Sequence, residues 1–197
     1  MVFSPGTMYC IFVQLLQICN TGCPLALGRS FHPFPPATLM LKLYLAGPDV
    51  FRPDALSWAE TARQSVAALG HRALIPLDNE ATTAAGIFEA NLALISEADV
   101  VVANLNPFRG AEPDSGTAFE IGCAIALGKR VIAYLDDTRP QVDKLADWYG
   151  QALSHVDGRC FDPTGLAVEN FGLPVNLMLA VPCTWVRGTL EDALRSL

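Results

Sequence analysis

The chain has 197 residues, enough for one domain of ordinary size and a tail but short for two full domains. Its 20 acidic and 13 basic residues give a formal net charge of −7, which argues against nucleic acid or an anionic membrane surface as a partner. Because 51% of the residues are hydrophobic and 17% are charged, the composition predicts a compact globular fold and excludes a disordered chain.

Residues 1–39 differ from the rest of the chain, because they hold three of the six cysteines and no acidic residue. The apolar run at 8–19 is too short to span a bilayer, and no Lys or Arg precedes it, so a secretory signal is only weakly indicated. We expect residues 1–39 to be an N-terminal extension, either disordered or preceding a natural start at Met40. Residues 40–197 are then the functional domain.

The cysteines form no CxxC pair and have no histidine at metal-ligand spacing. The three histidines lie far apart in the sequence. We therefore expect free thiols in a reducing, cytoplasmic compartment. The sequence predicts neither a metal ion nor another cofactor.

From Met40 onward, short apolar runs alternate with segments of helical period, which is typical of βα units around a parallel sheet. The predicted strands are 43–46, 73–75, 100–103, 131–135 and a fifth near 183–186. The predicted helices are 53–69, 85–97, 116–127, 141–154 and an amphipathic C-terminal helix within 188–197. These elements describe an α/β fold with three layers, a flavodoxin-like doubly wound parallel sheet of about five strands.

In open parallel sheets, ligands bind beyond the carboxyl ends of the strands. The sequence offers three loops of this kind: 47–51 after the first strand, 104–110 after the third, and 111–117 before the third helix. We expect the functional residues on these loops.

Asp114 and Glu120 place two carboxylates at the start of the otherwise apolar third helix. On a regular helix, residues six apart are about 240° apart around the axis and about 9 Å apart along it, so the two side chains would not meet. If the helix begins near Gly116, Asp114 belongs to the preceding loop and both acids can face one cavity. Glu120 then lies in the first turn, where the helix dipole favours an ionised nucleophile.

A structural explanation of the same residues stays open. Asp114 is a suitable N-cap, and an acid near a helix N-terminus complements the dipole. The small residues around Glu120 favour the functional interpretation, because glycine and alanine leave room for a ligand that a capping acid does not need.

Several fragments occur in a defined order along the chain. They are YLAGP at 44–48, Asn91 with Ile95 and ADV at 98–100, ANL at 103–105 with PFRG at 107–110, and DSGTAFE at 114–120 with Gly122. Together they resemble the nucleoside 2-deoxyribosyltransferase family over about residues 42–178. Enzymes of that family move a 2-deoxyribosyl group between nucleobases through a covalent glycosyl-enzyme intermediate.

The resemblance implies roles for individual residues. Glu120 matches the nucleophile that attacks the anomeric carbon, Tyr44 a tyrosine that orients it, and Asp114 an aspartate that helps to bind the nucleoside. Gly47 falls in the first substrate-binding loop. Asn91 stands where some members use Asp to contact the base, and because an amide cannot act as an acid, the proton for the leaving base has to come from elsewhere, such as Asp114 or water.

The segment at 176–178 resembles one that completes the site of a neighbouring subunit by binding the sugar 5′-hydroxyl. Asn176 and Met178 would then act in a homo-oligomer whose sites are shared between subunits.

Aromatic side chains can stack on a base, and Phe51, Phe88 and Phe108 are candidates for this role or for ordinary core packing. Arg109 is expected either to hold its loop by pairing with Glu112 or Asp114 or to contact substrate.

These features favour a retaining deoxyribosyltransferase of nucleoside salvage that takes a 2′-deoxynucleoside and a free nucleobase. Two alternatives remain. One is an N-glycoside hydrolase of 2′-deoxynucleosides or their 5′-monophosphates, although the acid and proline in loop 47–51 disfavour a phosphate. The other is a noncatalytic nucleoside- or nucleotide-binding module on the same fold.

Overall fold

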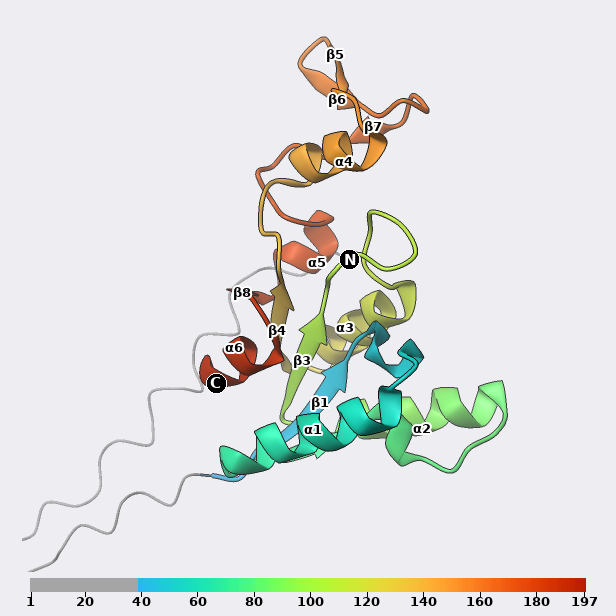
Figure 1. Ribbon diagram of the computed structural model, residues 1–197, viewed down its shortest axis with the longest axis vertical. Coiled ribbons are helices and arrows are strands. Elements are labelled where there is room, and N and C mark those ends of the chain that lie inside the picture. Colours follow the sequence, from blue (N-terminus) through green and yellow to red (C-terminus); the bar gives the residue numbers. More distant parts are fainter. Residues whose placement is uncertain (1–38) are drawn as a thin grey trace, which may run out of the picture. The chain divides into compact units, whose positions relative to one another are not determined.

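The computed structural model describes residues 39–197 (Figure 1). The extension predicted for residues 1–39 therefore lies, apart from its last residue, outside the described residues. Within 39–197, no helix has the length and apolar character needed to cross a bilayer.

The centre of the described fold is a parallel sheet with the strand order β2-β1-β3-β4-β8. The strands are β1 (Lys42–Ala46), β2 (Arg72–Leu74), β3 (Val100–Asn104), β4 (Arg130–Leu135) and β8 (Thr184–Arg187). All four neighbouring pairs are parallel, and the order reverses direction between β1 and β3. The predicted flavodoxin-like doubly wound sheet of five strands is confirmed.

Helices cover both faces of this sheet (Figure 1). They are α1 (Ala55–Ala68), α2 (Ala84–Glu97), α3 (Ser115–Ala126), α5 (Leu177–Ala180) and α6 (Leu190–Arg195). A further helix, α4 (Gln141–Tyr149), lies beyond the strand ends and contributes no residue to either core. Two short 3-10 helices, η1 (Pro48–Phe51) and η2 (Pro76–Asp78), follow β1 and β2 directly. Helices α2, α3 and α5 contribute to the core on one face, and α1 and α6 to the core on the other.

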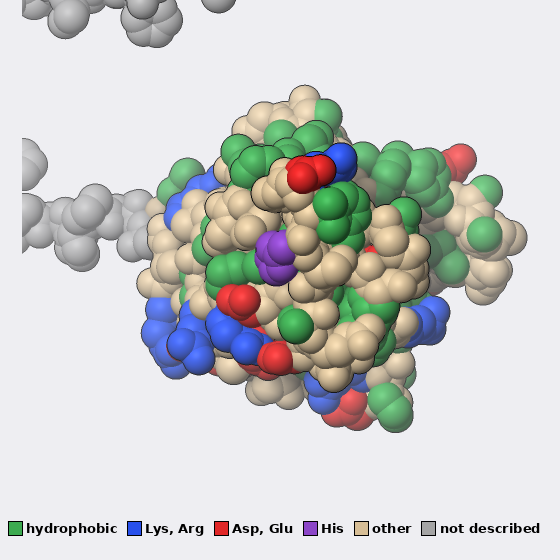
Figure 2. All heavy atoms as spheres, turned by 90° about the horizontal axis from the view of Figure 1, so that it is seen from above, with side chains coloured by type: hydrophobic (Ala, Val, Ile, Leu, Met, Phe, Trp, Pro, Cys, Tyr) green, Lys and Arg blue, Asp and Glu red, His purple; other side chains and the backbone are tan. Residues whose placement is uncertain are grey.

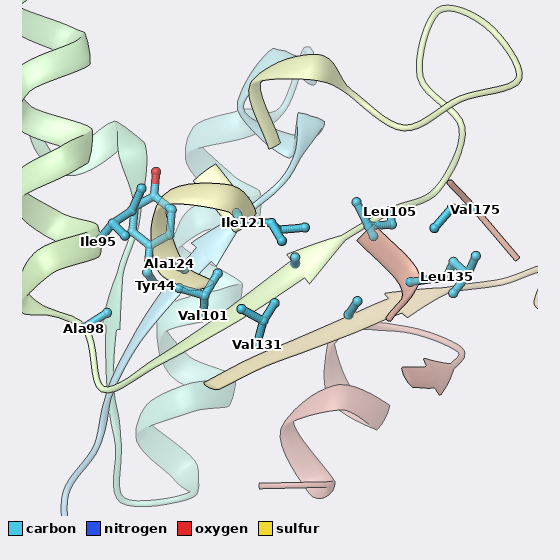
Figure 3. Packing of buried hydrophobic residues seen from close by; sticks show 14 of the residues in the cluster. Tyr44, Ile95, Ala98, Val101, Leu105, Ile121, Ala124, Val131, Leu135 and Val175 are labelled. Carbon is cyan, nitrogen blue, oxygen red and sulfur yellow. The ribbon is translucent and has the colours of Figure 1, made fainter. Parts of the chain in front are cut away.

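The division into two cores follows from the alternation of side chains along each strand. On β1, for example, Tyr44 and Ala46 face α2 and α3, whereas Leu43 and Leu45 face α1 and α6. Figure 3 shows the first of these cores, with the Tyr44 ring near Ile95 and Ala124 and its oxygen directed away from the strands. A strand buried on both faces needs a continuous apolar run, which is why these strands are recognisable in the sequence.

The region after α4 differs from the prediction. Helix α4 ends at Tyr149, because Gly150 takes a left-handed conformation, and not at residue 154. A second, antiparallel sheet follows, with the strands β5 (Ser154–Val156), β6 (Arg159–Phe161) and β7 (Ala167–Val168). Figure 2 looks onto this end of the molecule, where hydrophobic side chains are mixed with charged side chains of both signs.

The sequence did contain a signal for this second sheet. Asp157 and Gly158 join β5 to β6, and both have positive φ, as the two central residues of a type I′ hairpin turn do. Because the strands have only two or three residues and are mostly exposed, no apolar run marks them.

The chain turns tightly at Gly47, between β1 and η1. A Cβ atom at this position would lie 2.8 Å from Asn104 Cβ and 3.0 Å from Asp49 Oδ2. The glycine therefore allows the loop after β1 to pass close to the end of β3.

We predict that Gly47→Ala lowers the free energy of unfolding by about 1–3 kcal/mol, because neighbouring atoms must move to admit the methyl group. Gly122→Ala is the matched control, since no heavy atom lies within 4 Å of an added Cβ on this residue of α3. We expect the control to be neutral or up to about 1 kcal/mol more stable. Urea unfolding of the two variants measures the difference, and equal stabilities would contradict the close approach at Gly47.

Candidate active site

A cavity of about 420 Å³ opens at the carboxyl ends of β1 and β2. Its walls come from the loop and 3-10 helix after β1, the segment after β2, one turn of α2 and the first turns of α3. The predicted residues that line it are Gly47, Phe51, Asn91, Asp114 and Glu120. The structure thus brings together residues that are up to 73 positions apart in the sequence (120 − 47 = 73).

Tyr44 fixes the position of the Glu120 carboxylate. The Tyr44 hydroxyl donates a hydrogen bond of 2.6 Å to Glu120 Oε1, which joins β1 to α3. Tyr44 itself has no exposed surface, so its ring is fixed by the core and its hydroxyl has a defined position. This bond orients the carboxylate and leaves Glu120 lining the cavity.

The protonation of Glu120 differs from the sequence-based expectation. Helix α3 begins at Ser115, which makes Glu120 its sixth residue and places it beyond the first turn. The expected stabilisation of the ionised form by the helix dipole is therefore wrong, because this effect is confined to the first turn. Burial raises the pKa of Glu120 to about 7; the Tyr44 hydrogen bond opposes this rise, and the Asp114 carboxylate adds to it.

Asp114 both caps α3 and lines the cavity. Its Oδ2 accepts hydrogen bonds from the Thr117 backbone N–H at 2.9 Å and from Thr117 Oγ1 at 3.0 Å. The capping interpretation is thus correct, and it is compatible with the functional one, since Asp114 and Glu120 line the same cavity. As expected from the sequence, Asp114 lies just before the helix, so the two acids can share the cavity.

Asn91 reaches the cavity from α2, one turn after Ile87, which also lines it. Asn91 Oδ1 is buried and accepts no hydrogen bond from any residue in 39–197. A buried polar atom without a hydrogen bond lowers the free energy of unfolding by roughly 1–3 kcal/mol, and such atoms are typical of binding sites.

The segment after β2 is a wall of the cavity that the sequence analysis missed. Pro76, Leu77 and Asn79 line it, and the Asn79 side chain shapes the loop by bonding to Pro76 O at 2.6 Å and to Ala81 N at 3.1 Å. The signal was present, because this segment also follows a predicted strand and must lie at the same edge of the sheet.

The three phenylalanines predicted to stack on a base differ in their positions relative to the cavity. Phe51 lines the cavity and stacks on Phe108, with ring centroids 5.3 Å apart and planes 17° apart. Phe88 instead contacts Phe119, at 5.8 Å between centroids, and both rings are about half exposed. Phe108 therefore supports the cavity wall through Phe51, whereas Phe88 lies outside the wall.

Arg109 makes neither of the expected ion pairs with Glu112 and Asp114 within the described part of the chain. Its guanidinium lies over the rings of Phe108 and Phe51, 4.6 and 5.2 Å from their centroids. This contact is a cation–π interaction, and it holds the loop against the cavity wall.

Asn176 and Met178 do not line this cavity in the single chain. Asn176 caps α5 and donates to Glu169 Oε1 at 2.9 Å, while Met178 is 73% exposed. Both residues line a separate shallow hollow beside α3.

Comparisons with known proteins agree on the family. The family model described as nucleoside 2-deoxyribosyltransferase matches residues 43–178. A solved structure of a 2-desoxiribosyltransferase from Leishmania mexicana is 41% identical, with a TM-score of 0.65, and the match covers 79% of this chain and 95% of that one.

Two further relatives are more distant. A 2-deoxyribosyltransferase structure from Bacillus psychrosaccharolyticus is 29% identical over 47% of this chain and 71% of that chain, with a TM-score of 0.39. An uncharacterized protein of Schizosaccharomyces pombe is 29% identical in an alignment 155 residues long that covers 69% of this chain and 74% of the relative.

The fold and the cavity define an α/β protein with a carboxylate-bearing site at the edge of its sheet. With the match over 43–178, the chain belongs to the nucleoside 2-deoxyribosyltransferase family, whose members are deoxyribosyltransferase-type enzymes.

The raised pKa of Glu120 predicts how stability depends on pH. The folded chain holds the Glu120 proton more tightly than the unfolded chain, so stability contributed by this group falls as pH rises from about 4.5 through about 7. We expect Glu120→Gln to raise the free energy of unfolding at pH 8 by on the order of 1–3 kcal/mol and to change it little at pH 4.5.

Urea unfolding at the two pH values tests this expectation. Glu89→Gln, on the exposed surface of α2, is the control and should show no such difference between the pH values. A Glu120→Gln variant that is equally destabilised at both pH values would contradict the raised pKa.

Proposed function

We propose that this protein transfers the 2-deoxyribosyl group of a 2′-deoxynucleoside from one nucleobase to another, with Glu120 as the nucleophile. The observation that carries this proposal is the hydrogen bond between Tyr44 and Glu120 beside a cavity that Asp114 and Asn91 also line. A binding module has no need for a buried carboxylate with a raised pKa, so this arrangement favours an enzyme.

In the proposed mechanism, ionised Glu120 attacks C1′ of the sugar, and the bond between C1′ and the base nitrogen breaks. The electron pair of that bond leaves with the base, which takes a proton from Asp114 or from water. A nitrogen of the second base then attacks C1′, its N–H proton passes to the Asp114 carboxylate or to water, and the C1′–O bond breaks to release Glu120 as a carboxylate. Two inversions retain the configuration at C1′, as in retaining glycosidases.

Tyr44 acts as a positioning residue in this scheme. Its hydrogen bond holds one carboxylate oxygen, leaving the other free for C1′, and it opposes the rise in the Glu120 pKa that burial causes. The nucleophile is then about half ionised near pH 7 and can act in neutral solution.

The base is proposed to lie against Phe51, supported by Phe108 and Arg109, with the Asn91 carboxamide at its polar edge. The buried, unpaired Asn91 Oδ1 supports this role, because a donor on the base could satisfy it after a small side-chain rotation.

A neutral nucleoside suits the cavity better than a 5′-monophosphate. No Lys or Arg is among the residues that line it, and the Thr117 N–H at the start of α3 already binds Asp114. Two carboxylates would also repel a phosphate dianion. These features support the transferase over a nucleotide hydrolase.

We further propose that residues 40–197 form the catalytic domain of a cytoplasmic salvage enzyme and that it works as a homo-oligomer. The exposure of Met178 and the position of Asn176 away from the chain's own cavity support a role for both in a neighbouring subunit's site.

Incubation of the protein with deoxyinosine and adenine should yield deoxyadenosine, measured by product chromatography. Glu120→Ala should lower the exchange rate by at least about a thousandfold, since it removes the nucleophile. Glu89→Ala is the control and should retain full activity. Release of free deoxyribose without exchange would contradict the transferase, and substantial exchange by Glu120→Ala would contradict the nucleophile.

The rate of exchange at low substrate concentration should rise with pH through about 7, as Glu120 loses its proton. Tyr44→Phe removes a hydrogen bond that lowers the Glu120 pKa, so its profile should shift to higher pH. A shift of one unit reduces the rate at pH 7 about fivefold and leaves the rate at pH 9 nearly unchanged.

Tyr149→Phe, which removes a phenol hydroxyl from α4, should leave the profile where it is. An equal loss for Tyr44→Phe at every pH would show that the hydroxyl does not set the pKa of Glu120.

A further inference from the structure

The short helix η1 (Pro48–Phe51) carries part of the wall of the candidate active site. Val50 and Phe51 line the cavity, and Phe51 is 57% exposed. Asp49 is buried, at 8% exposure, whereas no apolar side chain among these four described residues is. Because apolar burial contributes little to anchoring η1, the contacts of Asp49 determine where this helix lies.

A buried hydrogen bond joins Asp49 to the end of β3. Asn104, the last residue of β3, donates from Nδ2 to Asp49 Oδ2 at 2.8 Å, and both side chains are buried. The guanidinium of Arg52 lies 3.9 Å from Asp49 and bonds more closely to Asp54, at 2.9 Å, where both groups are exposed to solvent. An ion pair that is this long and this exposed contributes little, so Asn104 is the partner that fixes Asp49.

Asn104 is fixed in turn by Asn106. Asn104 Oδ1 accepts from the Asn106 backbone N–H at 3.1 Å and from Asn106 Nδ2 at 2.9 Å. Asn106 Oδ1 accepts from the backbone N–H of Asp136, just after β4, at 2.9 Å. Because a backbone N–H can only donate, these bonds determine which end of each carboxamide is the oxygen. The Nδ2 group of Asn104 is therefore directed at Asp49, and η1 is tied to the ends of β3 and β4.

The same two segments meet a second time at the cavity wall. Phe51 of η1 stacks on Phe108, with ring centroids 5.3 Å apart, and Phe108 lies two residues after Asn106 in the loop that follows β3. The buried hydrogen bond and the ring contact therefore join η1 to β3 and its loop at two points. A shift of η1 away from Asn104 would separate the two rings and displace Phe51 from the wall.

We propose that Asp49 is a positioning residue, whose hydrogen bond with Asn104 holds η1 where Phe51 forms the wall against which the nucleobase lies. The inference rests on the proposed function for the identity of the ligand at that wall. Asp49 does not line the candidate active site, so it acts through Phe51. The pair of Tyr44 and Glu120 belongs to β1 and α3 and does not depend on this contact.

This role predicts that KM changes and kcat does not. Asp49→Ala should raise the KM for the deoxynucleoside and for the acceptor base about fivefold, because a misplaced Phe51 stacks poorly on the base. The value of kcat should change less than about twofold, since Tyr44 and Glu120 are unaltered. Phe51→Ala should raise both KM values about tenfold, and adding Asp49→Ala to it should raise them no further. Independent effects would instead multiply to about fiftyfold.

Swapping the two side chains provides a rescue variant. Asn104→Asp places two carboxyl groups against each other and should act like Asp49→Ala. Combining it with Asp49→Asn reverses donor and acceptor, and the carboxylate at position 104 can still accept from Asn106, so KM should return to within about twofold of the unaltered value. Asp162→Ala is the control, because it removes an aspartate that accepts backbone hydrogen bonds in the turn between β6 and β7, and it should leave KM unchanged.

Amide hydrogen exchange, followed by mass spectrometry of peptides that cover residues 48–55, reports on η1 without any assay of activity. The Arg52 N–H bonds to Asp49 O at 3.2 Å, so its protection depends on the helix staying in place. Asp49→Ala should speed exchange in this segment about tenfold. The swapped double variant and Asp162→Ala should exchange there as the unaltered chain does.

Two results would overturn the proposal: unchanged hydrogen exchange of residues 48–55 in Asp49→Ala, and KM effects of Asp49→Ala and Phe51→Ala that multiply. The swapped double variant stays decisive if a single variant fails to fold, because a raised KM in the folded double variant would also contradict the role of the hydrogen bond. Failure of the unaltered chain to exchange bases would contradict the proposed function, while the hydrogen exchange of η1 would still decide whether Asp49 positions the helix.

Discussion

The hydrogen bond from the Tyr44 hydroxyl to Glu120 Oε1 joins strand β1 to helix α3 across the core. It requires a tyrosine with no exposed surface, whose ring is fixed among apolar side chains, and a partly buried carboxyl group that reaches a cavity. Burial raises the pKa of that carboxyl, and the hydrogen bond from the Tyr44 phenol opposes the rise. The same hydrogen bond therefore affects both the orientation of Glu120 and its protonation. The other residues that line the cavity are arranged around the Glu120 carboxyl that this hydrogen bond fixes.

The edge formed by the carboxyl ends of the strands serves both faces of the sheet. The turn at Gly47 brings η1 close to the end of β3, and within η1 Val50 and Phe51 line the candidate active site, whereas Asp49 lines a second cavity on the opposite face of the sheet. The candidate active site holds Glu120, whose pKa burial raises to about 7, and the second cavity is lined by three acids, Asp49, Asp136 and Glu191. Two chemically different cavities thus lie beside a single loop of the doubly wound sheet.

Most of the main sheet was predictable because a parallel strand buried on both faces must be apolar along its length. The runs at 43–46, 100–103 and 131–135 carry that signal, and each became a strand. The antiparallel sheet of β5, β6 and β7 was not predicted, because its short, exposed strands need no apolar run. The sequence Asp157-Gly158, which favours a hairpin turn, could have indicated it. The role of the segment after β2 in the cavity was missed although its strand was found.

The sequence by itself determined the fold class, the edge of the sheet where the site lies, and the identity of the two acids, because apolar period and loop chemistry are local properties. Tertiary structure decided the ionisation of Glu120, since burial outweighed the helix dipole. It also decided that Arg109 lies on two aromatic rings instead of pairing with an acid. These outcomes depend on which side chains, far apart in the sequence, come into contact and on how much water they exclude. The spacing of residues along the chain does not contain that information.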